Sequence, residues 1–538
     1  MNDIVYIADF FVDQILGGGE LNDDELIKML ESKNYNVQKI QSHLVTSDDL
    51  LKNKDSFFII SNFCNLANKH VEWLQENAKY AIYEHDHKYL SSRNPAIYKN
   101  FHSPSRDIRS YFFYKNARAV LCQSSFHKSI IEKNLEIDNV TNLSGNLWSL
   151  EALEHLRKLS KNEKDSKCSV LNSTIQHKNT AGAIAYCLSN NLEYEKVSSA
   201  NYLDFLEKLS KNQSFVFLPK TPETLSRVAV EARMMNMSVR TNALVGASYE
   251  PWFKLKGEDL ISHMIEKRSE IFDTIVNLLE QKIDKQDKKI SIVSTFYKGE
   301  KFLEGFLQNM VEQTIFDKCE LILLDSASPG REKAIIAPYI EKYSNIRYYR
   351  IEDLLKPTPC FNMAIQKARG KYITFGFIDD RKSKTCLEDL YTELEKTNVD
   401  LVYGDVAQTE KENEVFDDND LGTLFEHSRY TFSRENMVKC LPGPMPMWKK
   451  SIHNVCGFFD DKDCDFADDW DMWLRAVQAG HVFKKIDKVV GLYLVGGRSQ
   501  QENNTDQLKE EAKIFFKYGH LFGQNFKRFE PYFGQFMR

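Results

Sequence analysis

Short apolar runs alternate with helix-length segments along the first part of the chain. Runs at 4–10, 56–61, 80–86 and 119–124 are each followed by a segment in which apolar residues recur at helical spacing. Strands that alternate with helices are typical of a parallel sheet covered by helices. The pattern therefore predicts an α/β lobe at the N-terminal end.

The same alternation continues in two further blocks. A polar, lysine-rich stretch at 156–167 indicates a crossing into a second lobe, which contains a strand at 215–220 and a helical segment after it. A new series begins near residue 289, and its strands are predicted at 289–297, 319–330, 346–352 and 371–380. A chain of 538 residues is long enough for about three globular units.

Two segments lie outside these blocks. Residues 258–287 have an amphipathic helical period and end in a charged run, which predicts a helical linker with a solvated face. Residues 515–538 are aromatic and basic; we expect packing against the body of the protein, with subunit pairing, stacking on an acceptor or nucleic-acid binding as alternatives. The predicted division is 1–155, 156–257, 258–287, 288–505 and a tail at 506–538.

Composition and charge narrow the class of protein. The formal net charge of -6 gives no overall electrostatic reason to bind nucleic acid or an anionic membrane. The first residues include acids and no basic region, so they predict a strand rather than a signal peptide, and no apolar run reaches the length of a membrane span. The ten cysteines occur singly, without a CxxC pair. We therefore expect reduced thiols, no structural zinc and a cytoplasmic protein.

The richest cluster of chemical groups is the stretch DFADDWDMWLRAVQAG at 465–480. Asp468, Asp469 and Asp471 precede a helical pattern whose apolar face contains Trp470, Trp473, Leu474 and Val477. A helix N-terminus favours negative charge, and a buried apolar face holds the first turn rigidly. The stretch predicts a platform for a carboxylate base, with an ordinary acidic N-cap as the alternative.

Further polar groups fall at the ends of predicted strands. Ser294 to Tyr297, Asp325, Asp379 and Asp380 all lie at carboxyl ends, where ligands bind in open parallel sheets. Carboxylates there accept hydrogen bonds from a base or ribose, and hard oxygen ligands suit Mg or Mn. The sequence therefore predicts one ligand crevice in this block.

Several motifs of this block occur together in a recognisable order. They are SIVSTFY, LILLDSASPG, the helix from Asn362 to Gly370, FIDD, DLVYGD, PGPMPMWKKSIHNVCGFFDD and DDWDMWLRAVQAG. Over residues 289 to about 500 the chain resembles the inverting GT-A glycosyltransferases of family 2. The resemblance implies a nucleotide-diphospho-sugar transferase domain that uses a nucleotide-sugar, most simply a UDP-sugar, and a glycan or other hydroxyl acceptor.

The resemblance also implies roles for particular residues. Asp469 matches the general base that deprotonates the acceptor hydroxyl, with its neighbour Asp468 as the second choice. On the donor side, Asp325 would take the nucleobase, while Thr295, Phe296 and Tyr297 would lie on the ribose side of the nucleotide. Asp379 and Asp380 match the acids that hold Mg or Mn.

The chain departs from the family pattern at the metal. Phe377 stands where another acid is expected, and Gly496 stands where a histidine is expected. An ion would then depend on Asp379 or Asp380, waters and the diphosphate. The alternative is that Arg381 or Arg498 carries the charge of the leaving group.

The N-terminal blocks carry a second, partial resemblance. The GGGE loop at 17–20, Ser124, Lys178, and Glu223 with Glu231 eight residues later resemble the retaining GT-B glycosyltransferases with a Glu-x7-Glu motif. The resemblance implies a GT-B-like pair of Rossmann-type lobes in which Lys178, Glu223 and Glu231 bind a donor.

This second pattern is incomplete. The arginine expected shortly before the lysine is missing from the segment LNSTIQHK, and residues 236–238 replace the expected Gly-x-Pro. A second active site and a non-catalytic module that binds the acceptor both remain open. A DNA base as acceptor is a third alternative, which only the aromatic and basic tail favours.

Overall fold

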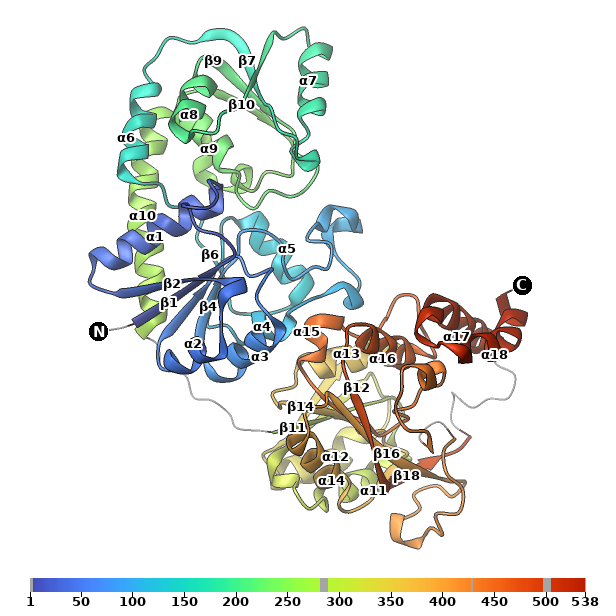
Figure 1. Cartoon of the computed structure of the whole chain (residues 1–538). Coiled ribbons are helices and arrows are strands. Elements are labelled where there is room, and N and C mark those ends of the chain that lie inside the picture. The colour runs from blue at the N-terminus through green and yellow to red at the C-terminus, as the bar shows by residue number, and fades with distance from the viewer. Residues whose placement is uncertain (1–2, 281–288, 427–428, 497–504, 538) are drawn as a thin grey trace. The chain divides into compact units, whose positions relative to one another are not determined.

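The computed structural model describes residues 3–280, 289–426, 429–496 and 505–537, which fold into two compact units (Figure 1). The first unit contains Met1–Ser103 and Ser110–Ile283. The second contains Asp284–Arg538 together with the short segment Pro104–Arg109. We describe each unit by itself.

The first lobe of unit 1 is built on a six-stranded parallel sheet in the order β2-β1-β3-β4-β5-β6. Its strands are β1 (Asp3–Ala8), β2 (Asn36–Gln41), β3 (Phe57–Ile60), β4 (Lys79–Tyr83), β5 (Val120–Cys122) and β6 (Val140–Asn142), and its helices are α1 (Gly18–Ser32), α2 (Ser47–Lys52), α3 (Asn68–Asn77), α4 (Tyr111–Asn116) and α5 (Ser125–Leu135). The central strands are apolar runs that are buried along their whole length. They form the parallel sheet that the alternation predicts.

The second lobe has a four-stranded parallel sheet in the order β10-β9-β7-β8. Its elements are α6 (Leu150–Leu159), β7 (Asp165–Leu171), α7 (Thr180–Ser189), β8 (Tyr194–Val197), α8 (Tyr202–Ser210), β9 (Asn212–Phe217), α9 (Arg227–Met234) and β10 (Ser238–Thr241). The predicted boundary between residues 155 and 156 falls inside α6. Leu153, Leu156 and Leu159 of this helix belong to the core of the second lobe, so the lysine-rich stretch is in part a packed helix.

Helix α10 (Gly257–Glu280) corrects the prediction of a linker at 258–287. Its first half contributes Leu260, Ile261 and Met264 to the core of the second lobe. Its second half contributes four residues to the core of the first lobe: Ile271, Phe272, Ile275 and Leu278. The helix therefore joins the two lobes of unit 1, and Figure 1 shows it running along both. The last residues of the predicted linker lie outside the described ranges.

Unit 2 contains an eight-stranded sheet in the order β13-β12-β11-β14-β17-β16-β18-β15. The strands are β11 (Ile290–Phe296), β12 (Cys319–Ser326), β13 (Ile346–Ile351), β14 (Tyr372–Phe375), β15 (Arg381–Lys382), β16 (Leu401–Thr409), β17 (Met447–Lys449) and β18 (Phe483–Leu494). The helices are α11 (Glu300–Val311), α12 (Glu332–Lys342), α13 (Pro357–Gln366), α14 (Cys386–Lys396), α15 (Ile452–Cys456) and α16 (Asp468–Gln478). The four strands from β13 to β14 are parallel as predicted, but β17 runs antiparallel to both of its neighbours.

The predicted strand at 371–380 is shorter in the structure. Strand β14 ends at Phe375, where Gly376 lies so close to Ile292 and Phe306 that a Cβ would meet both side chains. The chain then turns before β15, and Asp379 with Asp380 lies in this turn. The two acids are thus held in a turn at the carboxyl end of β14.

The C-terminal tail packs on the body of unit 2, as expected. Its helices are α17 (Thr505–Lys517) and α18 (Gln524–Gly534). Phe515, Phe522 and Phe533 are buried, and Phe515 stacks on both of the others. Phe522 and Phe533 also lie against Trp470 of α16, with ring centroids 6.4 and 6.1 Å away. These three rings are therefore used in packing. Among the described residues, none of the helices combines the length and apolar character that crossing a bilayer needs.

Candidate functional site

Helix α16 presents the acids that the sequence singles out. Its apolar face is buried, and Trp470, Trp473, Leu474 and Val477 are all less than 5% exposed. Asp468 and Asp469 form the first turn and are only partly buried. The predicted platform is therefore present: a rigid helix start with two carboxylates at its positive end.

The surroundings of Asp468 and Asp469 disfavour the charged form of each carboxyl group. A Cys440 thiol lies 3.3 Å from Asp469 Oδ2, and Thr358 of α13 hydrogen-bonds to Asp468. Neither acid forms an ion pair with a basic side chain within the described ranges. Burial, followed by the charge of Asp469, raises the pKa of Asp468 to about 7, and burial also raises the pKa of Asp469. Two adjacent acids with raised pKa values are suited to accept a proton near neutral pH.

The third acid of the helix has a different environment. Asp471 is 1% exposed, and its carboxylate accepts from Arg475 Nε at 2.8 Å, from Lys517 Nζ at 2.8 Å and from the Tyr518 hydroxyl at 3.0 Å. Burial alone would raise its pKa, but the two cations hold the pKa below its usual value. Asp471 therefore fixes α17 to α16.

A second pair of acids lies in the turn after β14. Asp380 is 5% exposed; its Oδ1 accepts from the backbone N–H of Leu494 at 3.1 Å, and its Oδ2 has no hydrogen-bond partner among the described residues. Burial, and then the charge of the partly exposed Asp379, raises the pKa of Asp380 well above its usual value. Burial also raises the pKa of Asp379.

The residues present fit a divalent cation. A buried carboxylate oxygen without a partner, beside a second carboxylate, is stabilised when a hard cation binds. The described residues contain no group of three or more possible ligands from His, Cys, Asp and Glu. An ion held here would therefore take two carboxylates at most from those residues and complete its shell with water or phosphate oxygens.

Asp325 does not face the crevice as an open carboxylate. It is fully buried, and it accepts from Ser328 N at 2.8 Å, from the Tyr348 hydroxyl at 2.8 Å and from Arg350 at 2.9 Å. Burial, together with Asp325, raises the pKa of Tyr348 to about 12. The exposed polar edge at this strand end thus belongs to Arg350, which Asp325 holds in place.

The other donor-side positions divide into core and surface. Thr295 is partly exposed at the end of β11, and Tyr297 is 42% exposed. Phe296 belongs to the hydrophobic core of unit 2, so its side chain is used in packing, and its contact with a donor stays a prediction.

The structure shows the surroundings of two positions at or near the departures from the family pattern, Phe377 and Arg381. Phe377 packs against Phe361 and Phe375, with ring centroids 5.5 and 5.3 Å away, so an aromatic cluster fills the place of the expected acid. Arg381 is buried and donates to the backbone carbonyls of Ile378 and Asp380, which does not fit the suggested role in neutralising a leaving group. Arg498 lies outside the described residues.

The residues that complete this site were mostly not predicted. Thr358 and Cys440 come from segments that no motif marked as chemical. Arg350 had a usable signal, because it is the direct cross-strand neighbour of Asp325 in the parallel pair of β12 and β13. Once two strands are paired in register, such neighbours follow.

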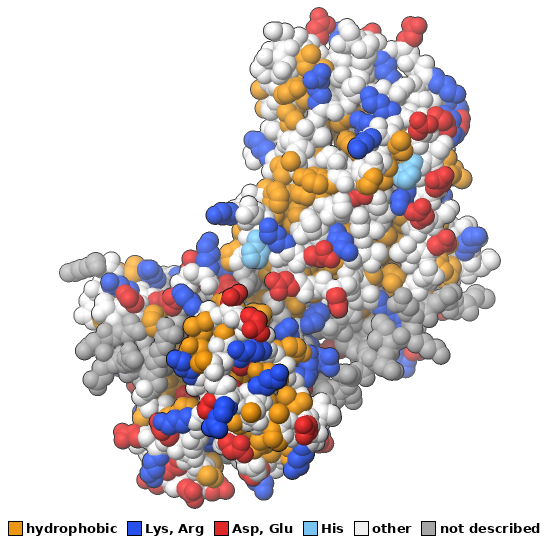
Figure 2. Space-filling view, turned by 180° about the vertical axis from the view of Figure 1, so that it is seen from behind, with side chains coloured by type: hydrophobic (Ala, Val, Ile, Leu, Met, Phe, Trp, Pro, Cys, Tyr) orange, Lys and Arg blue, Asp and Glu red, His pale blue; other side chains and the backbone are white. Residues whose placement is uncertain are grey.

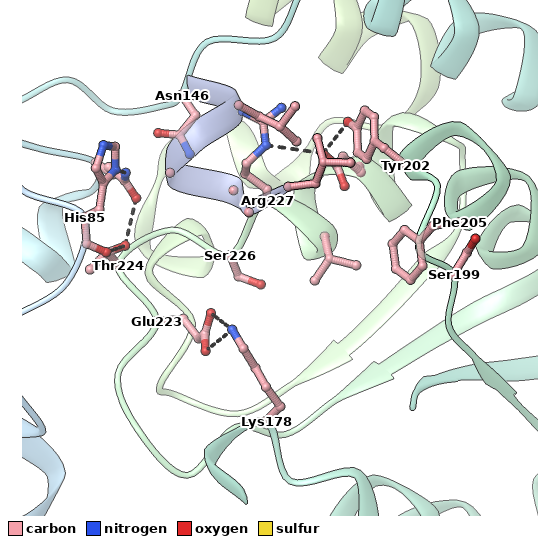
Figure 3. A pocket seen from close by; sticks show the side chains of 18 of the residues that line it. His85, Asn146, Lys178, Ser199, Tyr202, Phe205, Glu223, Thr224, Ser226 and Arg227 are labelled. Carbon is pink, nitrogen blue, oxygen red and sulfur yellow. Dashed lines mark hydrogen bonds and ion pairs between the residues drawn. The ribbon is translucent and has the colours of Figure 1, made fainter. Parts of the chain in front are cut away.

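The sequence-predicted residues of unit 1 meet in a cavity of about 380 Å³ (Figure 3). Both lobes contribute to its wall, which includes Gly17, Gly18, Gly19, His85, Asn146, Lys178, Tyr202, Phe205, Glu223, Ser226, Arg227 and Glu231. Ser124 instead caps α5 and donates to the Thr224 carbonyl. The glycine loop, the lysine and the two glutamates are thus brought together.

The charged groups in this cavity are paired with one another. Lys178 Nζ lies 2.9 and 3.0 Å from the two oxygens of Glu223, and the two side chains face each other in Figure 3. Glu231 is 2% exposed and accepts from Trp148 Nε1 at 2.9 Å and from the Tyr202 hydroxyl at 2.7 Å. Glu231 is therefore held within the wall.

On the outer face seen in Figure 2, acidic and basic side chains are interspersed.

Comparison with known proteins relates unit 2 to glycosyltransferases. Residues 291–457 match the model of glycosyl transferase family 2. An uncharacterised glycosyltransferase of Methanocaldococcus jannaschii is 24% identical over 230 residues, which are 42% of this chain and 76% of that protein. A cholesterol galactosyltransferase of Borreliella burgdorferi is 29% identical over 114 residues, which are 21% of this chain and 31% of that protein.

Solved structures resemble the chain more distantly. The S. aureus TarS fragment 1–349 in complex with UDP has a TM-score of 0.36 and 16% identity, over 45% of this chain and 72% of that one. The family match rests on residues 291–457, which contain the donor-side acids but stop just before α16. Residues 291–457 are therefore a glycosyl transferase family 2 domain, and this domain makes the protein a glycosyltransferase.

Proposed function

We propose that unit 2 transfers a sugar from a nucleotide-sugar, most simply a UDP-sugar, to an acceptor hydroxyl with inversion at the anomeric carbon. The observation that carries this proposal is the pair of partly exposed acids at the start of α16, which have raised pKa values and no basic partner within the described ranges. A general base needs a carboxylate that is accessible and has a pKa near the working pH.

Asp469 is the proposed base. It takes the proton of the acceptor hydroxyl while the hydroxyl oxygen forms a bond to the anomeric carbon, and the bond from that carbon to the diphosphate oxygen breaks. Attack from the face opposite the diphosphate inverts the configuration. The Cys440 thiol donates toward Asp469 Oδ2, and because burial raises the pKa of this thiol it stays protonated as a donor.

Asp379 and Asp380 would hold a Mg or Mn ion on the donor side. When bound, the ion stabilises the charge that develops on the departing diphosphate. The unpartnered Oδ2 of Asp380 supports this assignment. We propose that Asp325 contributes to the nucleotide side by fixing Arg350 and Tyr348, rather than by touching the base itself.

The acceptor is proposed only as a hydroxyl compound, a glycan in the first instance. The acceptor would have to reach Asp469 from the side on which α16 begins. Of the tail residues that suggested nucleic acid, Phe515, Phe522 and Phe533 are buried in the packing of unit 2. No other observation favours a nucleic-acid acceptor.

The test is to measure donor hydrolysis and transfer for a panel of nucleotide-sugars with the full chain and with Asp469→Asn. The exposed acid Asp487 on β18 gives a matched control, Asp487→Asn. We expect about a 10²- to 10⁴-fold loss of turnover for Asp469→Asn and no change for the control. NMR of the first-formed product gives the anomeric configuration. Equal rates in a folded Asp469→Asn protein would remove Asp469 from the mechanism, and retention would exclude single-step inversion.

A further inference from the structure

The cavity of unit 1 contains polar atoms that the protein leaves unsatisfied. Ser226 is 8% exposed and Asn146 is 2% exposed, yet neither Ser226 Oγ nor Asn146 Oδ1 has a hydrogen-bond partner among the described residues. Both side chains line the cavity and are seen in Figure 3. Arg227 Nε, in the same wall, also makes no hydrogen bond among the described residues. Buried polar groups are almost always satisfied in folded proteins, so these atoms indicate a ligand that supplies their partners.

The backbone supports the same reading. Ser226 has φ 73° and ψ 83°, a left-handed conformation that side chains other than glycine seldom adopt, and α9 begins at the next residue. Strained residues of this kind persist only where the surrounding structure imposes them, and they cluster at binding sites. This conformation places the Ser226 hydroxyl at the N-terminal end of α9.

The charges of the cavity do not suit a polyanion. Lys178 is paired with Glu223, and Arg227 Nε lies 3.5 Å from Glu231. The third positive feature is the start of α1, and the Glu20 carboxylate lies against it, because a Cβ on Gly17 would come within 2.2 Å of Glu20 Oε2. Each positive feature thus has an acidic group placed against it. A diphosphate would have to displace these acids or be repelled by them.

The remaining surface suits a neutral polyhydroxyl compound. Tyr202 and Phe205 of α8 add aromatic rings to the wall that contains the orphaned polar atoms. The rest of the wall is largely polar, which suits a ligand with many hydroxyl groups, and about 380 Å³ lies at the small end of small-molecule sites. A sugar ring offers both hydroxyls and an apolar face.

We infer that the cavity of unit 1 binds one neutral saccharide unit and holds it without a nucleotide. Ser226 Oγ and Asn146 Oδ1 accept from, or donate to, its hydroxyls, and the paired charges of Lys178 and Glu223 stay paired. The chain would then combine a saccharide-binding unit with the transferase of unit 2. This differs from the donor site that the GT-B resemblance implies for the same residues.

The experiment is binding of the labelled full chain to an array of neutral oligosaccharides, followed by titration of the glycans that it retains. Ser226→Gly removes the hydroxyl and relieves the positive φ, and Asn146→Ala removes the amide. Ser189→Ala, an exposed change at the end of α7, is the matched control. We expect a loss of affinity of tenfold or more for each of the two cavity variants and no loss for the control. Because Ser226→Gly relieves the positive φ, this variant should lose affinity while its unfolding temperature stays at or above that of the wild type.

Two further variants separate this inference from the proposed transfer. Asp469→Asn should abolish transfer but retain the glycan as well as the wild type does, and Lys178→Met serves only to locate any second nucleotide site. The inference is overturned if the wild type retains no glycan, or if retention depends on Asp469 rather than on Ser226. It is equally overturned if calorimetry with UDP detects a second nucleotide site that Lys178→Met removes.

Discussion

The carboxylates of the unit 1 cavity have partners that satisfy their charge, whereas the proposed site carboxylates of unit 2 do not. Glu223 faces Lys178, and Glu231 accepts two hydrogen bonds within the wall. Asp469 and Asp380 have raised pKa values, and among the described residues no basic side chain forms an ion pair with either of them. A carboxylate that is already paired has few free acceptor sites for a substrate, whereas an unpaired buried carboxylate is stabilised when it binds a proton or a metal ion. The difference supports the two proposals made above, that unit 2 carries the chemistry and that the cavity of unit 1 binds a saccharide.

One helix contains both states within four residues. Asp468 and Asp469 lie at the start of α16, where no described residue offers them a basic partner, and Asp471 on the same turn is paired with Arg475 and Lys517. Position on a helix does not decide what an acid does, because all three lie near the same positive helix end. The neighbouring elements decide it.

The largest effect is expected from removing the paired acid. Asp471→Ala leaves Arg475 and Lys517 without their carboxylate, and breaking a buried pair costs about 3–5 kcal/mol. The unfolding transition of unit 2 should move to much lower denaturant, while turnover of the protein that is still folded stays near wild type. Lys509→Ala, on the same helix as Lys517, is the control. Loss of activity without loss of stability would make Asp471 catalytic and break the comparison.

The unpaired acid of the donor side should behave in the opposite way. Burial raises the pKa of Asp380, so its charged form is disfavoured in the folded state, and wild-type stability falls as pH rises through that raised pKa. Asp380→Asn keeps an oxygen for the Leu494 N–H and removes the charge. In EDTA at pH 8 the variant should be more stable than the wild type, by about 1.4 kcal/mol for each unit of raised pKa.

The same variant also tests the metal. Mn²⁺ alone should bind the wild type weakly, Mn²⁺ with UDP should bind together and stabilise it, and neither should stabilise Asp380→Asn. Thermal shift with and without UDP measures this. Tight binding of Mn²⁺ without nucleotide would show a more complete ligand set, and full turnover in EDTA would show that transfer needs no ion.

A smaller effect is expected from the neighbour of the proposed base. The charges of Asp468 and Asp469 repel each other, and the pair titrates together. The charge of Asp469 raises the pKa of Asp468, which is about 7, so Asp469 ionises first, beside a neutral neighbour. Asp468→Asn should therefore remove an ionisation near pH 7 from the pH–rate profile and leave the acidic limb set by Asp469 in place. The profile of kcat from pH 5 to 9 shows both. An acidic limb that moves with this substitution would mean that Asp468, rather than Asp469, sets it.

Much of the fold followed from the sequence because buried parallel strands are continuous apolar runs. β3, β4, β11 and β12 lie where the runs predict them. β2, β8 and β10 were missed, and each is an edge strand that has no apolar run and whose residues are nearly all exposed or partly exposed. The spacing of apolar residues in α10 predicts a helix, but it does not show that the apolar face packs into the cores of both lobes of unit 1.

The site was predictable only in part. Position after a strand or at a helix start identified Asp325, Asp380 and Asp469, because those positions follow from local pattern. Their partners come from distant segments, so the burial of Asp325 under Arg350 and the thiol of Cys440 beside Asp469 were not visible in the chain. Whether an acid is paired is a property of the packed structure, and the comparison between the two units rests on it.

The smallest effect is expected from the charge pair of unit 1. Lys178 and Glu223 keep 28% and 13% of their side-chain surface exposed, and a pair that water still reaches is worth about 0–1 kcal/mol. Lys178→Met should therefore shift the unfolding of unit 1 by less than about 1 kcal/mol. With donor saturating and a small soluble acceptor, its turnover should stay within about twofold of wild type, because the pair lies in a different unit from Asp469. Lys196→Met, at the end of β8, controls for the loss of one surface charge. A tenfold fall in turnover would show that the charges of unit 1 take part in transfer, and the division between a reacting unit and a binding unit would have to be abandoned.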